Sequence, residues 1–322
     1  MGERRWETTT TMGDGTLGDN GAGRRRKVGM NSSFFCGLSR LRYLGCARLY
    51  IHLILVSEGS FTMSGGNNVV IGLSGCSSSG KTTLARLLRD IFPNTFILHE
   101  DDFYKPESEL PTKNGLLDWD CPEAISVPDM NKALTHIREN GTFPPFVDSK
   151  EDQNSVGKCP VSDEKIAAMK ARVSRWLEPG QPGHAIFTEG KLRVCLFDGF
   201  LLYCKEMETT MSLIDIKLFL LVSRAKAQQR REARDGYVTL EGFWKDPPGY
   251  VDKIVWPNYV EAHQWLFEEG NVEGRLNEKV LQEKDIKAQL GKGLDIDMET
   301  TLEWTIETII TELERRATEM AE

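Results

Sequence analysis

Apolar and polar residues follow two patterns along most of the chain: short continuous apolar runs, and longer segments with apolar residues at helical spacing. The runs predict four strands, at 68–74, 95–99, 192–198 and 214–222. The helical spacing predicts helices over 84–92, 126–140, 163–177 and 298–318. Because strands and helices alternate, we expect an α/β fold of three layers, a mostly parallel sheet with helices on both faces.

Two regions depart from this alternation. Residues 1–65 have little periodicity, and from Gly21 to Ser57 they contain no acidic residue. We expect them to form a disordered N-terminal extension, either a mitochondrial presequence or an upstream extension before a start at Met63. Residues 142–190 carry Pro/Gly-rich stretches around a helix, which predicts an insertion on the fold rather than a second core. The domain that carries this insertion spans 66–322.

Composition narrows the class of protein. The chain has 322 residues, of which 40% are hydrophobic and 27% charged, enough to bury a full core. Residues 63–322 hold 31 basic and 43 acidic residues, so we expect no nucleic-acid partner. The longest mainly apolar stretch of the extension, 49–56, is far too short for a membrane span, so we expect no membrane partner. The seven cysteines contain no C-x-x-C pair, which favours a reduced, cytoplasmic location.

One motif indicates the chemistry directly. The segment 75–82 fits G-x-x-x-x-G-K-[ST], follows an apolar run and precedes a helical pattern. A glycine-rich turn between a strand and a helix N-terminus presents backbone amides to phosphates. The motif fits ATP or GTP. In this pattern Lys81 reaches the terminal phosphates, and the Thr82 hydroxyl coordinates the Mg²⁺ that arrives with the nucleotide. The predicted ATP-binding residues are Gly75, Cys76, Ser77, Ser78, Ser79, Gly80, Lys81, Thr82 and Thr83.

Acidic residues after the second predicted strand indicate an acceptor site, because ligands of open parallel sheets bind beyond the carboxyl ends of strands. Of Asp101 and Asp102, we expect only one to face the phosphate, since successive strand residues point to opposite sides. We choose Asp101 as the group that takes a proton from an attacking hydroxyl. Further on, Trp119 could stack on a heteroaromatic ring and Asp120 could accept hydrogen bonds from ribose, while a core position for Trp119 stays open.

Two further features complete the candidate site. The third predicted strand ends in Asp198, the Walker-B arrangement, and we expect this carboxylate to position Mg²⁺ or its waters. Arg230, Arg231 and Arg234 lie on a helix that leads into a Gly/Pro-rich segment, which predicts a mobile lid at about 230–250. Arginines that close with a lid can stabilise charge on the transferring phosphoryl group and exclude water.

These residues together resemble the nicotinamide riboside kinases, P-loop enzymes related to the uridine kinases. The resemblance covers most of 68–262, including Asp101 to Glu109, Asn114 to Asp120 and Val255 to Tyr259. It implies ATP-dependent phosphorylation of the 5′-hydroxyl of nicotinamide riboside, and also of nicotinic acid riboside, within NAD salvage. It further implies the roles of four residues: a base at Asp101, a ribose anchor at Asp120, and a ring clamp formed by Trp119 and Tyr237.

Other readings stay open at this point. A kinase for uridine, cytidine or another small alcohol would keep the P-loop and the acceptor acid but need different ring contacts. A nucleotide-dependent switch or assembly protein is disfavoured, because the guanine-reading pattern [NT]-K-x-D is absent at Thr112-Lys113-Asn114-Gly115. The sequence leaves the oligomeric state open.

Overall fold

The computed structural model describes residues 67–150, 157–234, 236–239 and 242–320, so the predicted N-terminal extension lies outside the described residues. The centre of the described part is a parallel five-stranded sheet in the order β2-β5-β1-β6-β9. Its strands are β1 (Asn68–Gly75), β2 (Thr95–His99), β5 (Arg193–Gly199), β6 (Ile216–Leu220) and β9 (Ile286–Ala288). The four predicted strands are confirmed, and the short edge strand β9 was not predicted.

The four predicted helices are also confirmed, as α1 (Lys81–Ile91), α2 (Val127–Asn140), α3 (Asp163–Trp176) and α9 (Met298–Glu319). Local signals set their ends: α2 stops at Gly141, whose φ of 65° is left-handed, and the Asp297 side chain caps α9 by accepting a hydrogen bond from the Thr300 N–H. Shorter helices complete the set: α4 (Pro182–His184), α5 (Glu208–Ser212), α6 (Arg224–Glu232), α7 (Trp256–His263) and α8 (Glu278–Lys284).

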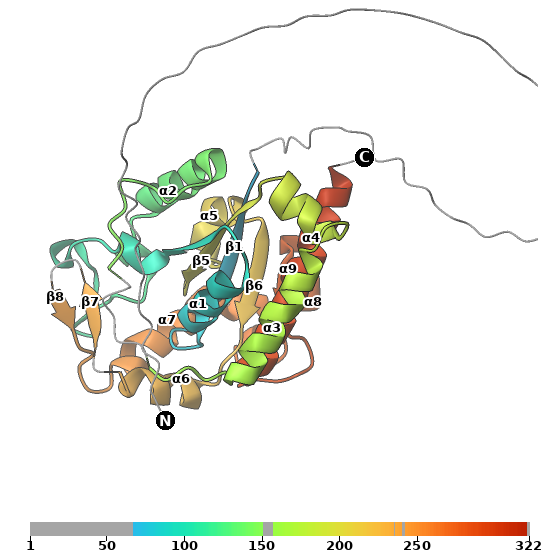
Figure 1. The fold of residues 1–322 in the computed structure, drawn as a ribbon. Helices are drawn as coiled ribbons and strands as arrows, with labels where there is room; N and C mark the ends of the chain where they lie inside the picture. The colour runs from blue at the N-terminus through green and yellow to red at the C-terminus, as the bar shows by residue number, and fades with distance from the viewer. Residues whose placement is uncertain (1–66, 151–156, 235, 240–241, 321–322) are drawn as a thin grey trace, which may run out of the picture. The chain divides into compact units, whose positions relative to one another are not determined.

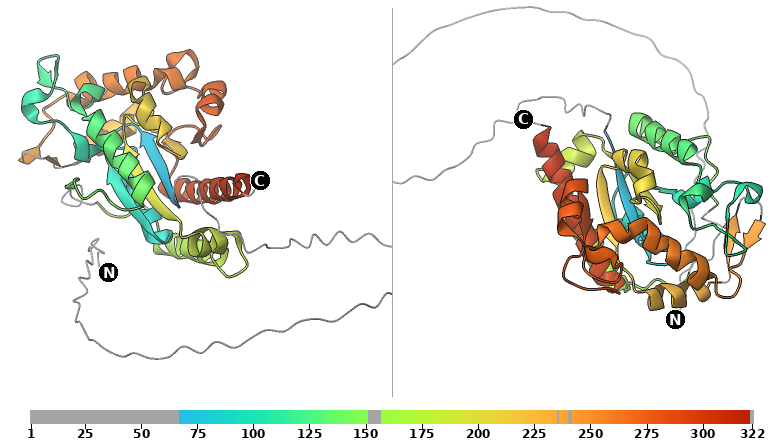
Figure 2. Two further views of the ribbon diagram at one scale, coloured as in Figure 1. Left: turned by 90° about the horizontal axis from the view of Figure 1, so that it is seen from above. Right: turned by 180° about the vertical axis from the view of Figure 1, so that it is seen from behind.

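Helices cover both faces of the sheet, which gives the three layers that the alternation predicts (Figures 1 and 2). α1, α3 and α9 lie on one face, with α1 against β2 and β5 and α9 against β6. On the other face, alternate strand residues such as Val70, Phe197 and Phe219 join one apolar cluster with residues of α2, α5, α7 and α8. No helix in the described part of the chain is both long and apolar enough to span a bilayer.

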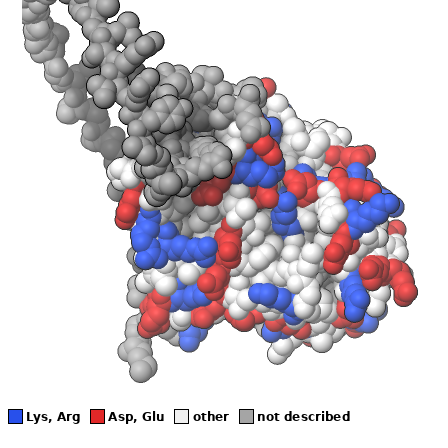
Figure 3. All heavy atoms as spheres, turned by 90° about the vertical axis from the view of Figure 1, so that its right-hand side faces the viewer, with Lys and Arg blue, Asp and Glu red and all other residues white. Residues whose placement is uncertain are grey.

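The helix of the 142–190 region packs onto the main domain. α3 contacts α1 and α9, and its residues Met169 and Val173 are buried. Lys165 pairs with Glu303 of α9 at 2.6 Å, and the Trp176 Nε1–H donates to Glu314. On the face that these helices share, charges of both signs are intermixed (Figure 3). The region therefore extends the helical layer on this side of the sheet.

Two small hairpins lie beyond the parallel sheet. β3 (Thr112–Lys113) pairs with β4 (Leu116–Leu117), and β7 (Tyr237–Thr239) pairs with β8 (Gly242–Trp244). The second hairpin follows α6 and falls within the predicted lid segment; Figure 1 shows it on the side of the sheet away from α3 and α9. Residues from both hairpin regions reach the cavity at the carboxyl ends of β1, β2 and β5.

Candidate active site

The P-loop connects β1 to α1 and depends on glycine geometry. Gly75 has a φ of 145°, and a Cβ there would lie 2.4 Å from the carbonyl oxygen of Leu220. The Lys81 ammonium is buried and donates to the carbonyls of Gly75 at 3.0 Å and Cys76 at 2.9 Å. Burial lowers the pKa of Lys81, an effect that nearby carboxylates such as Asp198 oppose. The backbone carbonyl groups of the P-loop thus hold the Lys81 ammonium against the loop.

The candidate metal site joins the start of α1 to the end of β5. The Thr82 hydroxyl donates to Asp198 at 2.6 Å, and His99 Nδ1 lies 2.5 Å from the other Asp198 oxygen. Burial alone would raise the pKa of Asp198, but His99, Thr82 and Lys81 together hold it below its usual range. A hydroxyl and an ionised carboxylate are hard oxygen donors of the kind Mg²⁺ takes.

The described residues contain no cluster of three His, Cys, Asp or Glu side chains that could hold a metal alone. A two-oxygen site fits an ion that gains its remaining ligands from phosphates and water, as Mg²⁺ does in nucleotide sites. The oxygen donors of Thr82 and Asp198 therefore fit a Mg²⁺ bound together with ATP.

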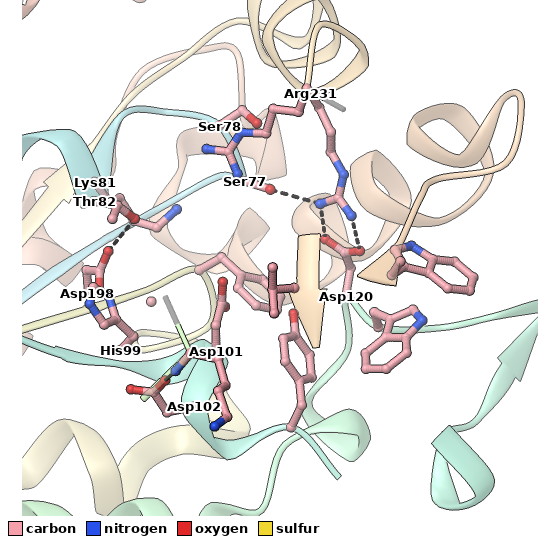
Figure 4. Close-up of a pocket in the computed structure, with 18 of the residues that line it drawn as sticks. Ser77, Ser78, Lys81, Thr82, His99, Asp101, Asp102, Asp120, Asp198 and Arg231 are labelled. Carbon is pink, nitrogen blue, oxygen red and sulfur yellow. Dashed lines mark hydrogen bonds and ion pairs between the residues drawn. The ribbon is translucent and has the colours of Figure 1, made fainter. Parts of the chain in front are cut away.

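The acceptor-side acids lie on a turn and not on a strand. β2 ends at His99, and residues 100–103 form a 3-10 turn. The premise that these acids alternate as strand residues was wrong, because both lie beyond β2, and both line the cavity. Which of them faces the phosphate stays a prediction. Asp102 accepts a hydrogen bond from the backbone N–H of Lys150 at 3.2 Å. Asp101 is exposed and lies between the P-loop side and Asp120 (Figure 4).

The predicted ribose anchor is tied to the lid. Asp120 is buried and accepts two hydrogen bonds from Arg231, at 2.7 and 3.0 Å. The same guanidinium group donates to the Ser77 hydroxyl at 2.8 Å (Figure 4). It also donates to Asp246 at 2.6 Å. Burial raises the pKa of Asp120, while Arg231 opposes the shift. One lid arginine therefore joins the P-loop, the acceptor acid and the lid hairpin.

The other lid arginines lie on either side of this contact. Arg230 donates to the carbonyl oxygens of Ser78 and Ser79, at 3.1 and 3.4 Å, so it braces the P-loop. Arg234 follows α6 and lines the cavity. Of the three arginines expected at the phosphates, one therefore contacts the P-loop backbone, one contacts Ser77 and Asp120, and one lines the cavity. The side chain of Tyr237 lies outside the described part of the structure.

Trp119 is both buried and part of the cavity wall. Its side chain is 6% exposed and packs edge-to-face with Tyr104, with ring centroids 5.2 Å apart. Its backbone N–H donates to Tyr250 Oη, which fixes the segment before Asp120. Trp119 can therefore be a core residue and still present part of its ring to a ligand in the cavity.

Most of the predicted residues converge on one cavity. Gly75, Cys76, Ser79 and Arg230 do not line it, and the Cys76 side chain belongs to the apolar core. The predicted residues that line it are Ser77, Ser78, Gly80, Lys81, Thr82, Thr83, Asp101, Trp119, Asp120, Asp198, Arg231 and Arg234.

Several residues of the site were missed from the sequence. Glu100 is fully buried and accepts the backbone N–H groups of Phe200 and Leu201, at 2.6 and 3.0 Å, so it joins the ends of β2 and β5. Trp244 lines the cavity from β8, and Asp246 follows it and contacts Arg231; their positions in the sequence gave no signal for either role. His99 gave no such signal, because its partner Asp198 is 99 residues away.

A nucleotide loop that faces acidic and arginine side chains across one cavity defines a class, the P-loop phosphotransferases. The chain belongs to the nicotinamide riboside kinase family. It is 35% identical over 249 residues to the nicotinamide riboside kinase of Schizosaccharomyces pombe, a match that covers 76% of this chain and 98% of that protein.

Two further relatives carry the same name. The chain is 33% identical over 217 residues to the nicotinamide riboside kinase of Eremothecium gossypii, covering 67% of this chain and 84% of that protein. It is 31% identical over 246 residues to that of Saccharomyces cerevisiae, covering 75% and 95%. No family model matches the chain.

Proposed function

We propose that the protein transfers the γ-phosphoryl group of ATP to the ribose 5′-hydroxyl of nicotinamide riboside, which yields the mononucleotide for NAD salvage. Family membership supports this reaction. One geometric observation carries the proposal: a single cavity is lined by Lys81 and Thr82 of the P-loop and by the acceptor-side acids Asp101 and Asp120. A triphosphate and a sugar alcohol could meet there, as in-line phosphoryl transfer requires.

At the nucleotide end, the backbone amides of loop 75–82 hold the phosphates. The Lys81 ammonium exchanges its contacts with loop carbonyls for the terminal phosphates. Thr82 and Asp198 would hold the Mg²⁺ that accompanies ATP, and this ion would neutralise charge on the phosphate oxygens. The chain's own contribution is position, since the α1 N-terminus and Lys81 both face the place where negative charge gathers.

At the acceptor end, the Asp101 carboxylate takes the proton of the 5′-hydroxyl while that oxygen bonds to the γ-phosphorus and ADP leaves. Asp120 accepts hydrogen bonds from the ribose hydroxyls, and Trp119 packs against the pyridine ring. In the lid, Arg230 braces the P-loop, Arg231 fixes Asp120 and Ser77, and Arg234 faces the cavity. Closure of these groups over the phosphates would stabilise the transferring group and exclude water.

The carboxylated acceptor, nicotinic acid riboside, belongs in the same proposal. It has the same sugar and the same cationic ring nitrogen, and differs only in a carboxylate where nicotinamide riboside has an amide. The ribose contacts and the phosphoryl transfer would be unchanged, so the two ribosides should differ mainly in KM.

A side-by-side turnover assay with nicotinamide riboside, nicotinic acid riboside, uridine and cytidine tests the proposal. We expect kcat/KM for the two pyridine ribosides to exceed that for the pyrimidine ribosides at least about tenfold, the factor that one stacking contact supplies. Equal or better use of uridine or cytidine would replace the proposal with a pyrimidine nucleoside kinase. Turnover of none of the four would point to another small-metabolite acceptor.

A further inference from the structure

A histidine lies beside the candidate metal site, on the neighbouring strand. In the register of β2 and β5, His99 pairs with Asp198, so both side chains start from the carboxyl ends of adjacent parallel strands. His99 Nδ1 lies 2.5 Å from Asp198 Oδ1, and the two side chains are 8% and 4% exposed. Both residues line the cavity, on the side where Thr82 lies (Figure 4). The contact therefore belongs to the nucleotide end of the site and is shielded from water.

The two carboxylate oxygens of Asp198 have different partners. Oδ1 contacts His99, whereas Oδ2 accepts the hydrogen bond from the Thr82 hydroxyl at 2.6 Å. Rotation of the carboxylate about the Cβ–Cγ bond would break the contact with His99 and leave a buried oxygen without a partner, which is costly. His99 thus keeps Oδ2 turned toward Thr82, the other oxygen donor of the candidate Mg²⁺ site.

The chemistry of the pair decides which atom carries the hydrogen. Burial opposes ionisation of Asp198, but the contacts with His99 and Thr82 keep its pKa below the usual range, so the carboxylate is ionised. An ionised carboxylate only accepts hydrogen bonds, so His99 Nδ1 must be the donor. Carboxylates that bind metal are commonly fixed by such an outer hydrogen bond, and Mg²⁺ is sensitive to their orientation because it demands nearly ideal octahedral geometry.

Pairing of the strands does not require the His99 side chain. The backbones of β2 and β5 pair along the whole of β2. Beyond β2, Glu100 accepts the N–H groups of Phe200 and Leu201, which joins the two chain segments a second time. What the imidazole adds at this position is the orientation of the Asp198 carboxylate.

Resting on the Mg²⁺ and ATP binding proposed above, we propose that His99 is a positioning residue of the nucleotide site, which orients Asp198 so that Oδ2 is presented to the Mg²⁺ bound with ATP. The ligand class is a divalent cation in complex with a nucleoside triphosphate. His99 acts through Asp198 and needs no contact with the nucleotide.

The test uses two substitutions of His99. His99→Phe keeps a ring but removes the donor, whereas His99→Asn places an amide nitrogen two bonds from Cβ, as Nδ1 is. ATP is titrated calorimetrically without an acceptor, once with excess Mg²⁺ and once with EDTA. We expect His99→Phe to weaken ATP binding about tenfold with Mg²⁺ and less than about twofold with EDTA, because loss of an outer partner costs roughly 10- to 100-fold in metal affinity. His99→Asn should stay within about threefold of wild type in both titrations.

Ile97→Ala is the matched control for damage to β2. Ile97 lies two residues before His99 and so on the same face of the strand, is partly buried and does not line the cavity. This variant should match wild type in both titrations. Where His99→Phe does not fold, His99→Ala takes its place with the same two expectations.

A double substitution tests whether His99 acts through Asp198. Asp198→Asn alone should lose the part of the ATP affinity that depends on Mg²⁺, and adding His99→Phe should weaken binding by less than about twofold more, because the two residues act as one unit. Independent, multiplying losses would contradict the inference.

The remaining outcomes separate this inference from the proposed reaction. Equal weakening by His99→Phe with Mg²⁺ and with EDTA would assign His99 to strand packing and overturn the inference, and so would an equal loss in His99→Asn. If wild type binds ATP no more tightly with Mg²⁺ than with EDTA, the inference fails, while turnover of nicotinamide riboside would leave the proposed reaction standing. If the titrations follow the expectations but nicotinamide riboside is not phosphorylated, the proposed reaction fails and the role of His99 stands.

Discussion

The two ends of the cavity are built in different ways. The nucleotide end is made by one contiguous segment, 75–82, in which Gly75 lets the backbone pass close to Leu220 of β6. The acceptor end is made by side chains from four segments, the turn after β2, the Trp119-Asp120 segment, the end of α6 and the β8 hairpin. The geometry of the nucleotide end depends on backbone φ/ψ angles and on steric space around the glycines. The geometry of the acceptor end depends on charge pairing between buried side chains.

The charge pairing at the acceptor end is concentrated on Arg231. This guanidinium lies between the carboxylates of Asp120 and Asp246, and all three side chains are mostly shielded from water. Removal of one member of such a group leaves a buried charge without a partner. The stability lost in this way exceeds the net stability that the intact pair contributes. A substitution at a P-loop serine leaves no buried charge without a partner, because backbone N–H groups bind the phosphates there.

The largest effect should come from Asp101→Ala, which removes the proposed base while leaving the nucleotide end intact. We expect kcat for nicotinamide riboside to fall about 10²- to 10⁴-fold, as for loss of general-base catalysis. ATP affinity, measured by calorimetry, should stay within twofold of wild type, since Asp101 lies across the cavity from the P-loop (Figure 4). Full turnover by this variant would remove Asp101 from the base role, and lost ATP binding would show that the two ends are not separable.

The next effect tests the backbone at the nucleotide end. Gly75→Ala places a Cβ 2.4 Å from the Leu220 carbonyl, whereas Gly115→Ala, also at positive φ, meets nothing within 4 Å. We expect Gly75→Ala to lose about 3 kcal/mol of unfolding free energy and Gly115→Ala about 1 kcal/mol, the left-handed cost alone. Denaturant titration measures both values. Similar losses in the two variants would contradict a steric role for Gly75.

A smaller effect should come from Trp119→Leu, which keeps an apolar side chain but removes the aromatic face and the Nε1–H. KM for nicotinamide riboside should rise about tenfold while KM for ATP stays unchanged, because a cation–π contact contributes roughly 1–2 kcal/mol. Circular dichroism checks that the variant is folded. An unchanged KM for the riboside would assign Trp119 to the core alone.

The smallest effect concerns pH and stability through Glu100. Burial, aided by Asp101, raises the pKa of Glu100 to about 8 against the pull of the Phe200 and Leu201 N–H groups. The folded state therefore keeps a proton that the unfolded chain releases near pH 4.5, and the stability that this proton contributes is lost as pH rises through 8.

Glu100→Gln removes this titration but keeps an oxygen that can accept the two N–H groups. Relative to wild type, the melting temperature of the variant should rise from pH 5 to about pH 8 and level off above it, where Glu100 is ionised in both the folded and the unfolded state. Thermal unfolding across this range measures the difference. A difference that does not change with pH would show that Glu100 is ionised throughout.

The sequence predicted the sheet and the nucleotide end because both depend on local patterns. The apolar run of β1 and the spacing of 75–82 lie within one continuous stretch. The three-residue strand β9 has no such pattern and exists because it pairs with β6. The contacts of Asp246 and Trp244 depend on Arg231 and on hairpin pairing, neither of which has a spacing rule. Strand alternation does not apply to Asp102, because β2 ends at His99 and residues 100–103 form a 3-10 turn.

The central claim is that one cavity delivers phosphate to a primary alcohol and not to water. Phosphorus-31 NMR of the product from ATP and nicotinamide riboside tests it directly. The account predicts one new phosphomonoester resonance coupled to the two 5′-protons of the ribose, in amounts equal to the ADP formed. ADP accompanied by inorganic phosphate, or a phosphate coupled to a single ribose proton, would contradict it.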